Sequence, residues 1–235
     1  MDMRSGTPFD IPRYLSVLPL FQEMDRPELE RLGTGCTLRR LLRGDMVFSV
    51  GEPCQAFHVV VTGQVKLFAL SPAGQEKVIE IIAPGQSFAE ALMFMGRPYI
   101  VSAQALSDSL VLNIGKPAVE TEIASDPKFA LRMLAGIARR MHRLVRDVES
   151  YALHSGMQRV IGYLLRDQKR EDCCTGEEIT VSLPVSKATI ASRLSLTPEY
   201  FSRVLHELES SGLVRVDKRD VHILDTRRLA DAMAP

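Results

Sequence analysis

Apolar residues recur in steps of three and four along residues 127–154, between strongly charged flanks. Ser125 and Asp126 can cap the start of this segment, and Pro127 fits the first position of a helix. A stripe this narrow is typical of a coiled-coil seam, although about three heptads are the minimum for that interpretation. The expected seam residues are Leu134, Ile137, Met141, Leu144, Val148 and Tyr151. Two structures fit: a parallel homodimer joined along this helix, or an amphipathic helix packed on its own domain.

Upstream of this helix the pattern has the short period of β-strands. Glycines recur, mostly about eleven residues apart, between segments rich in β-branched and aromatic residues. Glycine at the turns makes positive φ cheap, so we expect an antiparallel barrel or roll. The expected strands are 46–50, 57–61, 65–70, 77–82, 101–105 and 110–114. Before them, the chain up to about Gly35 predicts a lead-in with one helix that opens at Pro27.

Downstream of the long helix, two short helices have clear capping signals. Ser186 stands at the N-cap of the first, and Thr197 at the N-cap of the second, with Pro198 at its first position. Ser195 and Leu196 leave room only for a tight turn, as in a helix-turn-helix. The other expected elements are a helix at 157–169, a strand at 179–183, wing strands at 213–216 and 221–224, and a last helix from Asp225 to near Met233.

The second short helix carries residue types that read DNA bases. Glu199, Ser202 and Arg203 share one face, and a recognition helix enters the major groove by its N-terminal residues. Arginine can bind guanine bidentately and glutamate can accept from cytosine. A plain surface ion pair between Glu199 and Arg203, worth about 0.3–0.5 kcal/mol, is the alternative. The helix-turn-helix context favours DNA reading.

Other polar residues nearby suit contacts to phosphate, which position a protein without specifying sequence. Lys218 and Arg219 lie at the expected tip of the wing. Lys187 and Arg193 are expected to act similarly, and Ser186 and Thr197 can offer hydroxyls or amides to phosphate.

Composition narrows the class of protein. A chain of 235 residues that is 46% hydrophobic is ample for two small domains. With a net charge of +0, DNA contacts must come from local clusters. No apolar run approaches the roughly 18 residues of a membrane span, and the N-terminus lacks a signal-peptide pattern. We therefore expect a cytoplasmic protein with no membrane partner. The four cysteines, Cys36, Cys54, Cys173 and Cys174, lack the paired spacing of a zinc or iron–sulfur site.

Three stretches resemble the β-roll of the CRP/FNR family of bacterial transcription regulators: RGDMVFSVGEP (43–53), GQVKLF (63–68) and SPAGQEKVIEIIAPGQSFAE (71–90). The likeness covers nearly the whole chain. It implies an α+β fold with a double-stranded antiparallel β-roll like that of cyclic-nucleotide-binding domains, a long central dimerisation helix and a C-terminal winged helix-turn-helix. The corresponding domains are a lead-in helix (1–35), the β-roll effector domain (36–120), the central helix (121–154) and the DNA-binding domain (155–235).

The resemblance also indicates where an effector would bind, and that it is not cAMP. Members that bind cyclic nucleotides hold the phosphate with an Arg-Ser pair, which here falls on Tyr99 and Ile100, whereas Glu90 is kept. A buried phosphate without a guanidinium has no partner for its charge, although Arg97 is close enough to move in. The iron–sulfur cluster of FNR is also not expected, because its closely spaced N-terminal cysteines are missing.

The stretch EALMFM…YIVSAQA looks closest to the DNR branch of the family, whose members respond to nitric oxide and are thought to use haem. A haem needs an apolar slot and one axial ligand, for which His142 and His58 are the candidates. Ordinary core packing and surface histidines are the simpler alternative. The residues expected to line the effector pocket are Phe68, Glu90, Leu92, Met93, Phe94, Met95, Tyr99 and Ile100.

The spacing Glu199-x-x-Ser202-Arg203 resembles the recognition helix of FNR-type regulators, which read a TTGAT-like half-site. The resemblance implies a homodimer on a near-palindrome, and activation through contact with RNA polymerase, while a repressor would share this architecture. A regulatory module that signals through partner proteins is a second class, against which the helix-turn-helix and wing argue. No enzyme is expected, because Glu90 lacks an evident His, Ser or metal partner.

Overall fold

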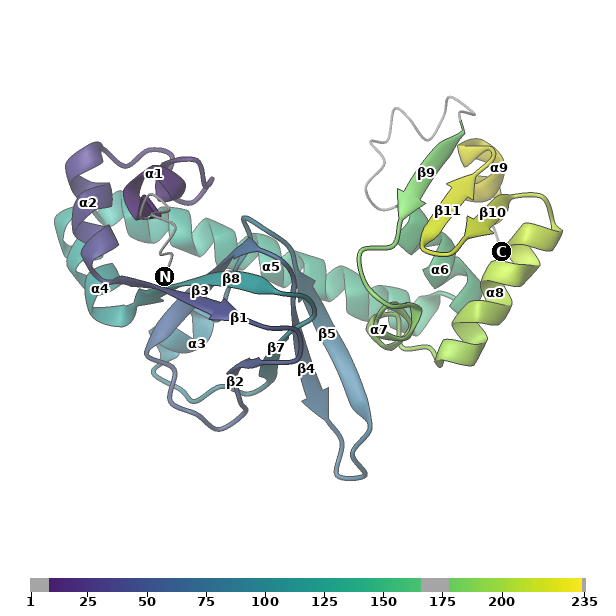
Figure 1. Cartoon of the computed structure of the whole chain (residues 1–235), viewed down its shortest axis with the longest axis horizontal. Coiled ribbons are helices and arrows are strands. Elements are labelled where there is room, and N and C mark those ends of the chain that lie inside the picture. The colour runs from purple at the N-terminus through teal and green to yellow at the C-terminus, as the bar shows by residue number, and fades with distance from the viewer. Residues whose placement is uncertain (1–8, 166–177, 234–235) are drawn as a thin grey trace, which may run out of the picture. The chain divides into compact units, whose positions relative to one another are not determined.

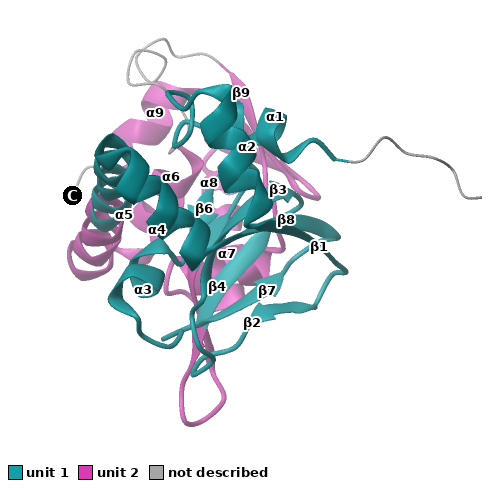
Figure 2. Cartoon of the chain, turned by 90° about the vertical axis from the view of Figure 1, so that its left-hand side faces the viewer, with its two compact units in different colours: residues 1–68, 80–141 teal, residues 69–79, 142–235 magenta. Residues whose placement is uncertain are grey.

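The computed structural model describes residues 9–165 and 178–233, and Figure 1 shows the elements in chain order. The chain divides into two compact units (Figure 2): unit 1 holds 1–68 and 80–141, and unit 2 holds 69–79 and 142–235. One boundary falls inside the long helix. The other lies at a hairpin, whose tip at 69–79 groups with the C-terminal residues, a division that the expected domain boundaries did not contain.

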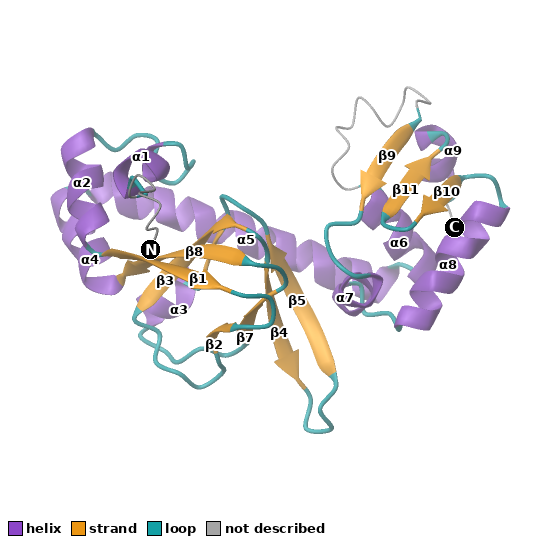
Figure 3. Ribbon diagram, viewed as in Figure 1, coloured by secondary structure: helices purple, strands orange, loops and turns teal. Residues whose placement is uncertain are grey.

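The β-strands of unit 1 form two antiparallel sheets that make the expected roll (Figure 3). The first sheet has the order β1-β8-β3-β6 and the second β2-β7-β4-β5, whose neighbouring strands β4 and β5 run on into the hairpin tip of unit 2. The first consists of β1 (Cys36–Leu41), β8 (Ser109–Gly115), β3 (Ala56–Thr62) and β6 (Ser87–Phe88), and the second of β2 (Met46–Phe48), β7 (Ser102–Ala105), β4 (Val65–Leu70) and β5 (Glu76–Ile82). The sequence pattern did not predict β1 or the two-residue β6.

Glycine is required at the turn between β3 and β4. Gly63 has a φ of +80°, and a Cβ there would lie 2.2 Å from the Oγ of Ser109. The turn therefore combines a left-handed backbone with a close approach to β8, which a side chain would disrupt.

Three short helices flank the roll within unit 1: α1 (Ile11–Ser16), α2 (Arg26–Thr34) and α4 (Lys116–Ser125). The expected lead-in helix is α2, which begins with a capping box between Asp25 and Glu28. The structure adds α1, capped by Asp10, and α4, both of which the sequence pattern missed. Arg31 of α2 pairs with the buried Glu122 of α4 at 3.1 Å, which ties the two helices together.

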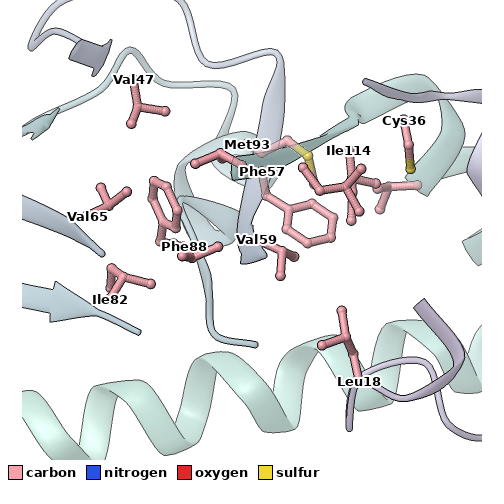
Figure 4. Close-up of a cluster of buried hydrophobic side chains, with 14 of the residues drawn as sticks. Leu18, Cys36, Val47, Phe57, Val59, Val65, Ile82, Phe88, Met93 and Ile114 are labelled. Carbon is pink, nitrogen blue, oxygen red and sulfur yellow. The ribbon is translucent and has the colours of Figure 1, made fainter. Parts of the chain in front are cut away.

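One continuous apolar core fills unit 1 (Figure 4). It joins residues of the roll, such as Phe57 and Phe88, to Leu18 of the lead-in segment. The long helix α5 (Pro127–Leu153) adds Phe129 and Met133, and the rings of Phe129 and Phe21 stack with centroids 6.0 Å apart. The first turns of α5 are therefore packed into the core of their own unit, as the amphipathic-helix alternative requires.

Unit 2 contains the expected helix-turn-helix and wing. Its helices are α6 (Gly156–Leu164), α7 (Lys187–Arg193), α8 (Pro198–Ser210) and α9 (Thr226–Asp231). Its strands are β9 (Ile179–Ser182), β10 (Val214–Asp217) and β11 (Asp220–Ile223), in the sheet order β10-β11-β9. The expected end of the first helix near Lys169, and the pair Cys173 and Cys174, lie outside the described residues.

Candidate nucleic-acid interface and effector region

The helices α7 and α8 begin with the side-chain caps that the sequence predicted. The Oγ of Ser186 accepts a hydrogen bond from the amide of Thr189 at 3.1 Å. The Oγ1 of Thr197 accepts one from the amide of Tyr200 at 3.2 Å. The turn between the two helices is short, because α7 ends at its C-cap Leu194 and α8 begins at its N-cap Thr197, and Ser195 in this turn has a left-handed φ of 56°. The predicted helix-turn-helix is confirmed.

The helix α8 buries one side and exposes the other. The buried residues are Phe201, Val204, Leu205 and Leu208. Glu199, Ser202 and Arg203 are exposed, at the i, i+3 and i+4 spacing that places three side chains on one face. This exposed polar face, anchored from behind by an apolar one, is the geometry that a recognition helix needs in the major groove.

Tyr200 is a neighbour of this face that the sequence analysis left out. The guanidinium of Arg203 lies over the Tyr200 ring, 4.9 Å from its centroid. The ring packs against Gly156 at the start of α6, where a Cβ would come within 2.3 Å of the ring atom Cε1. The sequence pattern placed Gly156 just before a helix expected at 157–169, whereas in the structure it is the first residue of α6, where the Tyr200 ring leaves no room for a side chain.

The expected phosphate contacts occupy different settings. Lys218 and Arg219 are exposed at the wing tip, where the turn between β10 and β11 has two residues and not the four expected. Lys218 adopts a left-handed φ of 53° in this turn. Lys187, half-buried, begins α7 next to the cap residue Ser186.

Arg193 does not lie where a phosphate contact was expected, and that prediction was wrong. Its side chain is buried, its Nη2 pairs with Asp147 of α5 at 2.5 Å, and its Nη1 donates to the hydroxyl of Tyr151. The arginine fixes α7 to α5 inside unit 2 because a buried guanidinium requires such partners. Its position at the end of α7, facing inward, could not be read from its residue type.

Tyr99, which falls where the resemblance places a phosphate-binding arginine, points into the roll. Only 5% of it is exposed, and its ring stacks on Phe48 with centroids 3.6 Å apart. Its hydroxyl lies 3.0 Å from the Nε2 of His58. Burial, reinforced by Cys54, raises the pKa of Tyr99. The side chain therefore fills the interior with an uncharged ring and brings no positive charge for a phosphate.

His58 is a buried polar residue with both ring nitrogens engaged. Its Nδ1 lies 2.7 Å from the Oδ1 of Asn113, so with that oxygen as acceptor Nδ1 carries the proton and Nε2 accepts from Tyr99. Burial, with a smaller contribution from Arg39, lowers the pKa of His58 to about 4. The imidazole is therefore neutral at physiological pH.

Glu90 begins the short helix α3 (Glu90–Met95) and faces an arginine that the sequence analysis did not single out. Arg140 of α5 pairs with Glu80 at 2.7 Å and with Glu90 at 3.6 Å. It also donates to the carbonyl oxygen of Ser87 at 3.0 Å. One guanidinium thus joins β5, β6 and α3 to the long helix within unit 1. The sequence alone could not distinguish Arg140 from the other arginines in 127–154.

The expected pocket residues divide into buried and exposed sets. Phe68 and Met93 are buried, as Glu90 and Tyr99 are, and Leu92 packs against the core. Phe94, Met95 and Ile100 are 40%, 66% and 70% exposed. The expectation that these three line a closed apolar slot was wrong, because their side chains are exposed: Phe94 and Met95 at the end of α3 and Ile100 in the segment after it.

The histidines fit a haem unequally. An axial histidine needs a nitrogen lone pair directed at the iron. His58 has none to give, since Nε2 accepts from Tyr99 and Nδ1 faces Asn113. His142 is exposed on α5 beside the seam residue Met141. His58 therefore does not fit the group, and of the two candidate histidines His142 is the one whose exposed ring suits the expectation.

The expected seam of α5 is mostly uncovered. Leu134, Met141, Leu144 and Val148 are exposed, as are their apolar neighbours Leu131 and Val145. Ile137 is half-buried. Tyr151 differs, because its hydroxyl donates to the carbonyl of Arg193 at 2.6 Å and its ring lies under Lys77. The tyrosine thus belongs to the interior of unit 2 in this structure, although its spacing continues the seam.

Within 9–165 and 178–233, no helix has the length and apolar character needed to cross a membrane. Over the same residues, no group of three or more His, Cys, Asp or Glu side chains could hold a metal ion.

A β-roll followed by a winged helix-turn-helix with an exposed reading face defines a DNA-binding transcription regulator with a cyclic nucleotide-binding type of domain. Comparison with known domains agrees: the Cyclic nucleotide-binding domain matches residues 38–126, and the Crp-like helix-turn-helix domain matches residues 158–232. The chain belongs to the CRP/FNR family of transcription regulators.

Known relatives span most of the chain. It is 26% identical to the CRP-like cAMP-activated global transcriptional regulator of Mycobacterium tuberculosis. The alignment spans 188 residues, which are 80% of this chain and 84% of the relative. It is 34% identical to DNR from Pseudomonas aeruginosa, whose crystal structure aligns with 94% of this chain and 96% of its own at a TM-score of 0.50. FixK2 from Bradyrhizobium japonicum aligns with a TM-score of 0.73 over 85% of this chain and 98% of its own, at 24% identity, a likeness of fold alone.

Proposed function

We propose that the protein is a homodimeric transcription regulator that reads an FNR-like TTGAT palindrome and responds to a small effector other than cAMP. The exposed set Glu199, Ser202 and Arg203 on α8 is the observation that carries this proposal. Arginine and glutamate at this spacing can contact guanine and cytosine in the major groove. The stack of Arg203 on Tyr200 holds the guanidinium near the end of the helix that would enter the groove.

The homodimer is supported by the uncovered apolar face of α5. Leu134, Met141 and Val148 repeat at seven-residue intervals and are exposed in the single chain. A second copy of the same helix has the matching face, and such pairing would place two recognition helices about 34 Å apart on one side of the duplex. A near-palindromic site follows from that two-fold symmetry.

The case against cAMP rests on Tyr99. A buried phosphate needs a charged partner, and here the position is filled by a ring stacked on Phe48 and bonded to His58. Glu90 matches the acidic residue of the members that bind cyclic nucleotides, but here its carboxylate is paired with Arg140 of α5. The relative from Mycobacterium tuberculosis is cAMP-activated, so cAMP is the runner-up effector.

Haem with nitric oxide is a second effector, favoured by the 34% identity to DNR and by the DNR-like stretch at 90–105. The exposed His142 is the residue that would hold the group. Haem would supply an iron that binds nitric oxide. The bonds of His58 to Tyr99 and Asn113 weigh against that histidine. For the output, we propose activation by contact with RNA polymerase in the cytoplasm, although operator placement also permits repression.

DNA binding can be tested by electrophoretic mobility shift with a TTGAT palindrome and a scrambled duplex of equal length. We expect specific affinity at least 1,000-fold above non-specific affinity at a stated salt concentration. Equal affinity for the two duplexes would overturn the proposed function.

The dimer can be tested with Leu134→Asp combined with Val148→Asp. Both side chains are exposed in the single chain, so the variant should fold. Charge in the seam should give a monomer by sedimentation and lower affinity for the palindrome by about 100-fold or more, since two linked half-sites bind with effective concentrations that single ones lack. Leu153→Asp, an exposed change outside the seam, is the matched control. A double variant that stays dimeric would contradict the proposal.

The effector can be tested by titrating purified protein with cAMP in a calorimeter and with haem in a spectrophotometer. We expect no heat of binding with cAMP. A Soret band that shifts on haem addition, is retained in His58→Ala and is lost in His142→Ala would support the haem proposal, and an unshifted band would remove it.

A further inference from the structure

The hairpin between β4 and β5 is matched to the Cyclic nucleotide-binding domain by sequence, yet its tip at 69–79 belongs to unit 2. Its lysine, Lys77, contacts the helix-turn-helix at the point where α7 ends. The Nζ of Lys77 donates to the carbonyl of Ser192 at 2.7 Å and to that of Arg193 at 3.1 Å. It also donates to the Oγ of Ser195 at 2.7 Å. Three oxygens therefore surround one ammonium group, which has three N–H donors.

The backbone of the hairpin makes contacts beside this lysine. The Oγ of Ser192 accepts a hydrogen bond from the amide of Val78 at 2.9 Å and donates to the carbonyl of Glu76 at 3.1 Å. The serine thus bridges two backbone groups on either side of Lys77. With the three contacts of the lysine, five hydrogen bonds join the hairpin to α7 and the following turn.

The residue at the end of this cluster is conformationally unusual. Ser195 lies in the helix-turn-helix turn with a φ of 56°, a conformation that a residue with a side chain adopts at a cost. Arg159 of α6 donates to the carbonyl oxygens of Leu194 and Ser195 at 2.6 and 3.3 Å, on the same turn. The turn that sets the angle between α7 and α8 is therefore held by cations from two separate elements.

The environment of Lys77 makes its position costly unless the oxygens are present. Its ammonium lies over the ring of Tyr151, 4.6 Å from the centroid. Burial, then repulsion by Arg193 and Arg159, lowers the pKa of Lys77 to about 8, while Asp147 acts in the opposite sense. The cost of desolvating the ammonium is offset by its hydrogen bonds to three oxygens. The contact therefore requires a group with several N–H donors at this position.

We propose that Lys77 is a positioning residue for DNA recognition: it fixes the end of α7 and the Ser195 turn, and through them the orientation of α8. The proposal rests on the proposed function, in that α8 is taken as the reading helix. Lys77 acts through Ser192, Arg193 and Ser195 and touches no base. A lysine of the β4–β5 hairpin thereby contributes to DNA affinity from outside the DNA-binding domain of the sequence.

The test compares Lys77→Met with the wild type. Methionine keeps the length and apolar contacts of the lysine but has no donors, and it removes the cost of holding a partly desolvated cation, which offsets the three lost hydrogen bonds. We expect an unchanged melting temperature with affinity for the palindrome reduced about tenfold. Lys77→Arg, which restores a donor group, should recover part of the affinity. Lys128→Met, which removes one exposed lysine at the start of α5, should bind as the wild type does.

Salt dependence separates positioning from a direct phosphate contact. If Lys77 only orients α8, the slope of log affinity against log salt stays at its wild-type value in Lys77→Met. If the lysine neutralised a phosphate itself, the slope would fall by about 0.9, and the proposal would be overturned.

A double-mutant cycle and hydrogen exchange complete the test. Ser195→Ala removes one acceptor, so its effect on affinity should be smaller in the Lys77→Met background than in the wild type. Amide exchange at 192–197 should quicken in Lys77→Met without DNA. Additive effects on affinity, or unchanged exchange, would overturn the proposal. A wild type without preference for the palindrome would overturn the proposed function, and the exchange data would still decide whether Lys77 holds the turn.

Discussion

The recognition helix α8 and the stretch 88–105 of the roll were both predicted to carry function, yet they expose their chemistry in opposite ways. On α8 the polar residues Glu199 and Arg203 are exposed and the apolar residues are buried. In 88–105 the polar Glu90 and the phenol of Tyr99 are buried, while Met95 is exposed. The periodicity of the sequence predicts which face of a helix is buried and which is exposed. The lining of a pocket depends instead on which side chains point inward once the roll has closed.

Burial of polar groups in the roll has an energetic consequence that the exposed face of α8 lacks. Tyr99, His58 and Asn113 form a chain of hydrogen bonds in an apolar interior, where each unpaired member would be costly. Arg203 at the surface needs no partner to fold. Changes in the roll are therefore expected to act on stability first, and changes on α8 on DNA affinity first.

The largest expected effect is the response of stability to acid through His58. Its folded pKa of about 4 lies below the ordinary 6.5, so the unfolded chain takes up the proton first. Stability from the neutral imidazole is present above pH 6.5 and is lost as pH falls towards 4, by about 3 kcal/mol in total. Urea unfolding followed by circular dichroism at pH 7, 6, 5 and 4.5 should show a shallower pH dependence in His58→Gln. If the stability of the two proteins changed with pH in the same way, the claim that buried His58 destabilises the roll in acid would be contradicted.

The next largest effect concerns Arg203 on the exposed face of α8. Arg203→Ala should cost about 1–3 kcal/mol in specific binding and relax base preference at one position, with no loss of thermal stability. Competition binding with single-base variants of the TTGAT box measures both. Arg227→Ala, an exposed arginine on α9, is the matched control. A variant that keeps its full preference, or one that melts early, would show that Arg203 has a structural role like that of Arg193.

The smallest effect separates positioning from reading within the DNA-binding surface. Lys218→Ala at the wing tip should weaken binding to all duplexes about equally and lower the salt slope by about 0.9. Filter binding at several salt concentrations, with specific and scrambled duplexes, is sufficient. If only the specific duplex were affected, Lys218 would read sequence and the division between helix and wing would need revision.

Arg193 and Tyr151 illustrate what the pattern could not provide. Each was assigned by its spacing or its neighbours, Arg193 to phosphate and Tyr151 to the seam, and each is used inside unit 2 with Asp147 and Lys77. Their partners are distant in sequence, so only the folded chain brings the groups within hydrogen-bonding distance. The same holds for Arg140 with Glu80 and Glu90.

By itself the sequence determined the order of roll, long helix and winged helix-turn-helix, the caps at Ser186 and Thr197, and the exposed face of α8. These features depend on local periodicity, capping and turn residues, which act over a few positions. The tertiary structure alone decided that Tyr99 fills the roll, that Phe94, Met95 and Ile100 are exposed, and that Lys77 reaches the end of α7. Those outcomes depend on which distant segments meet, and hence on burial and hydrogen bonding between residues that no local pattern connects.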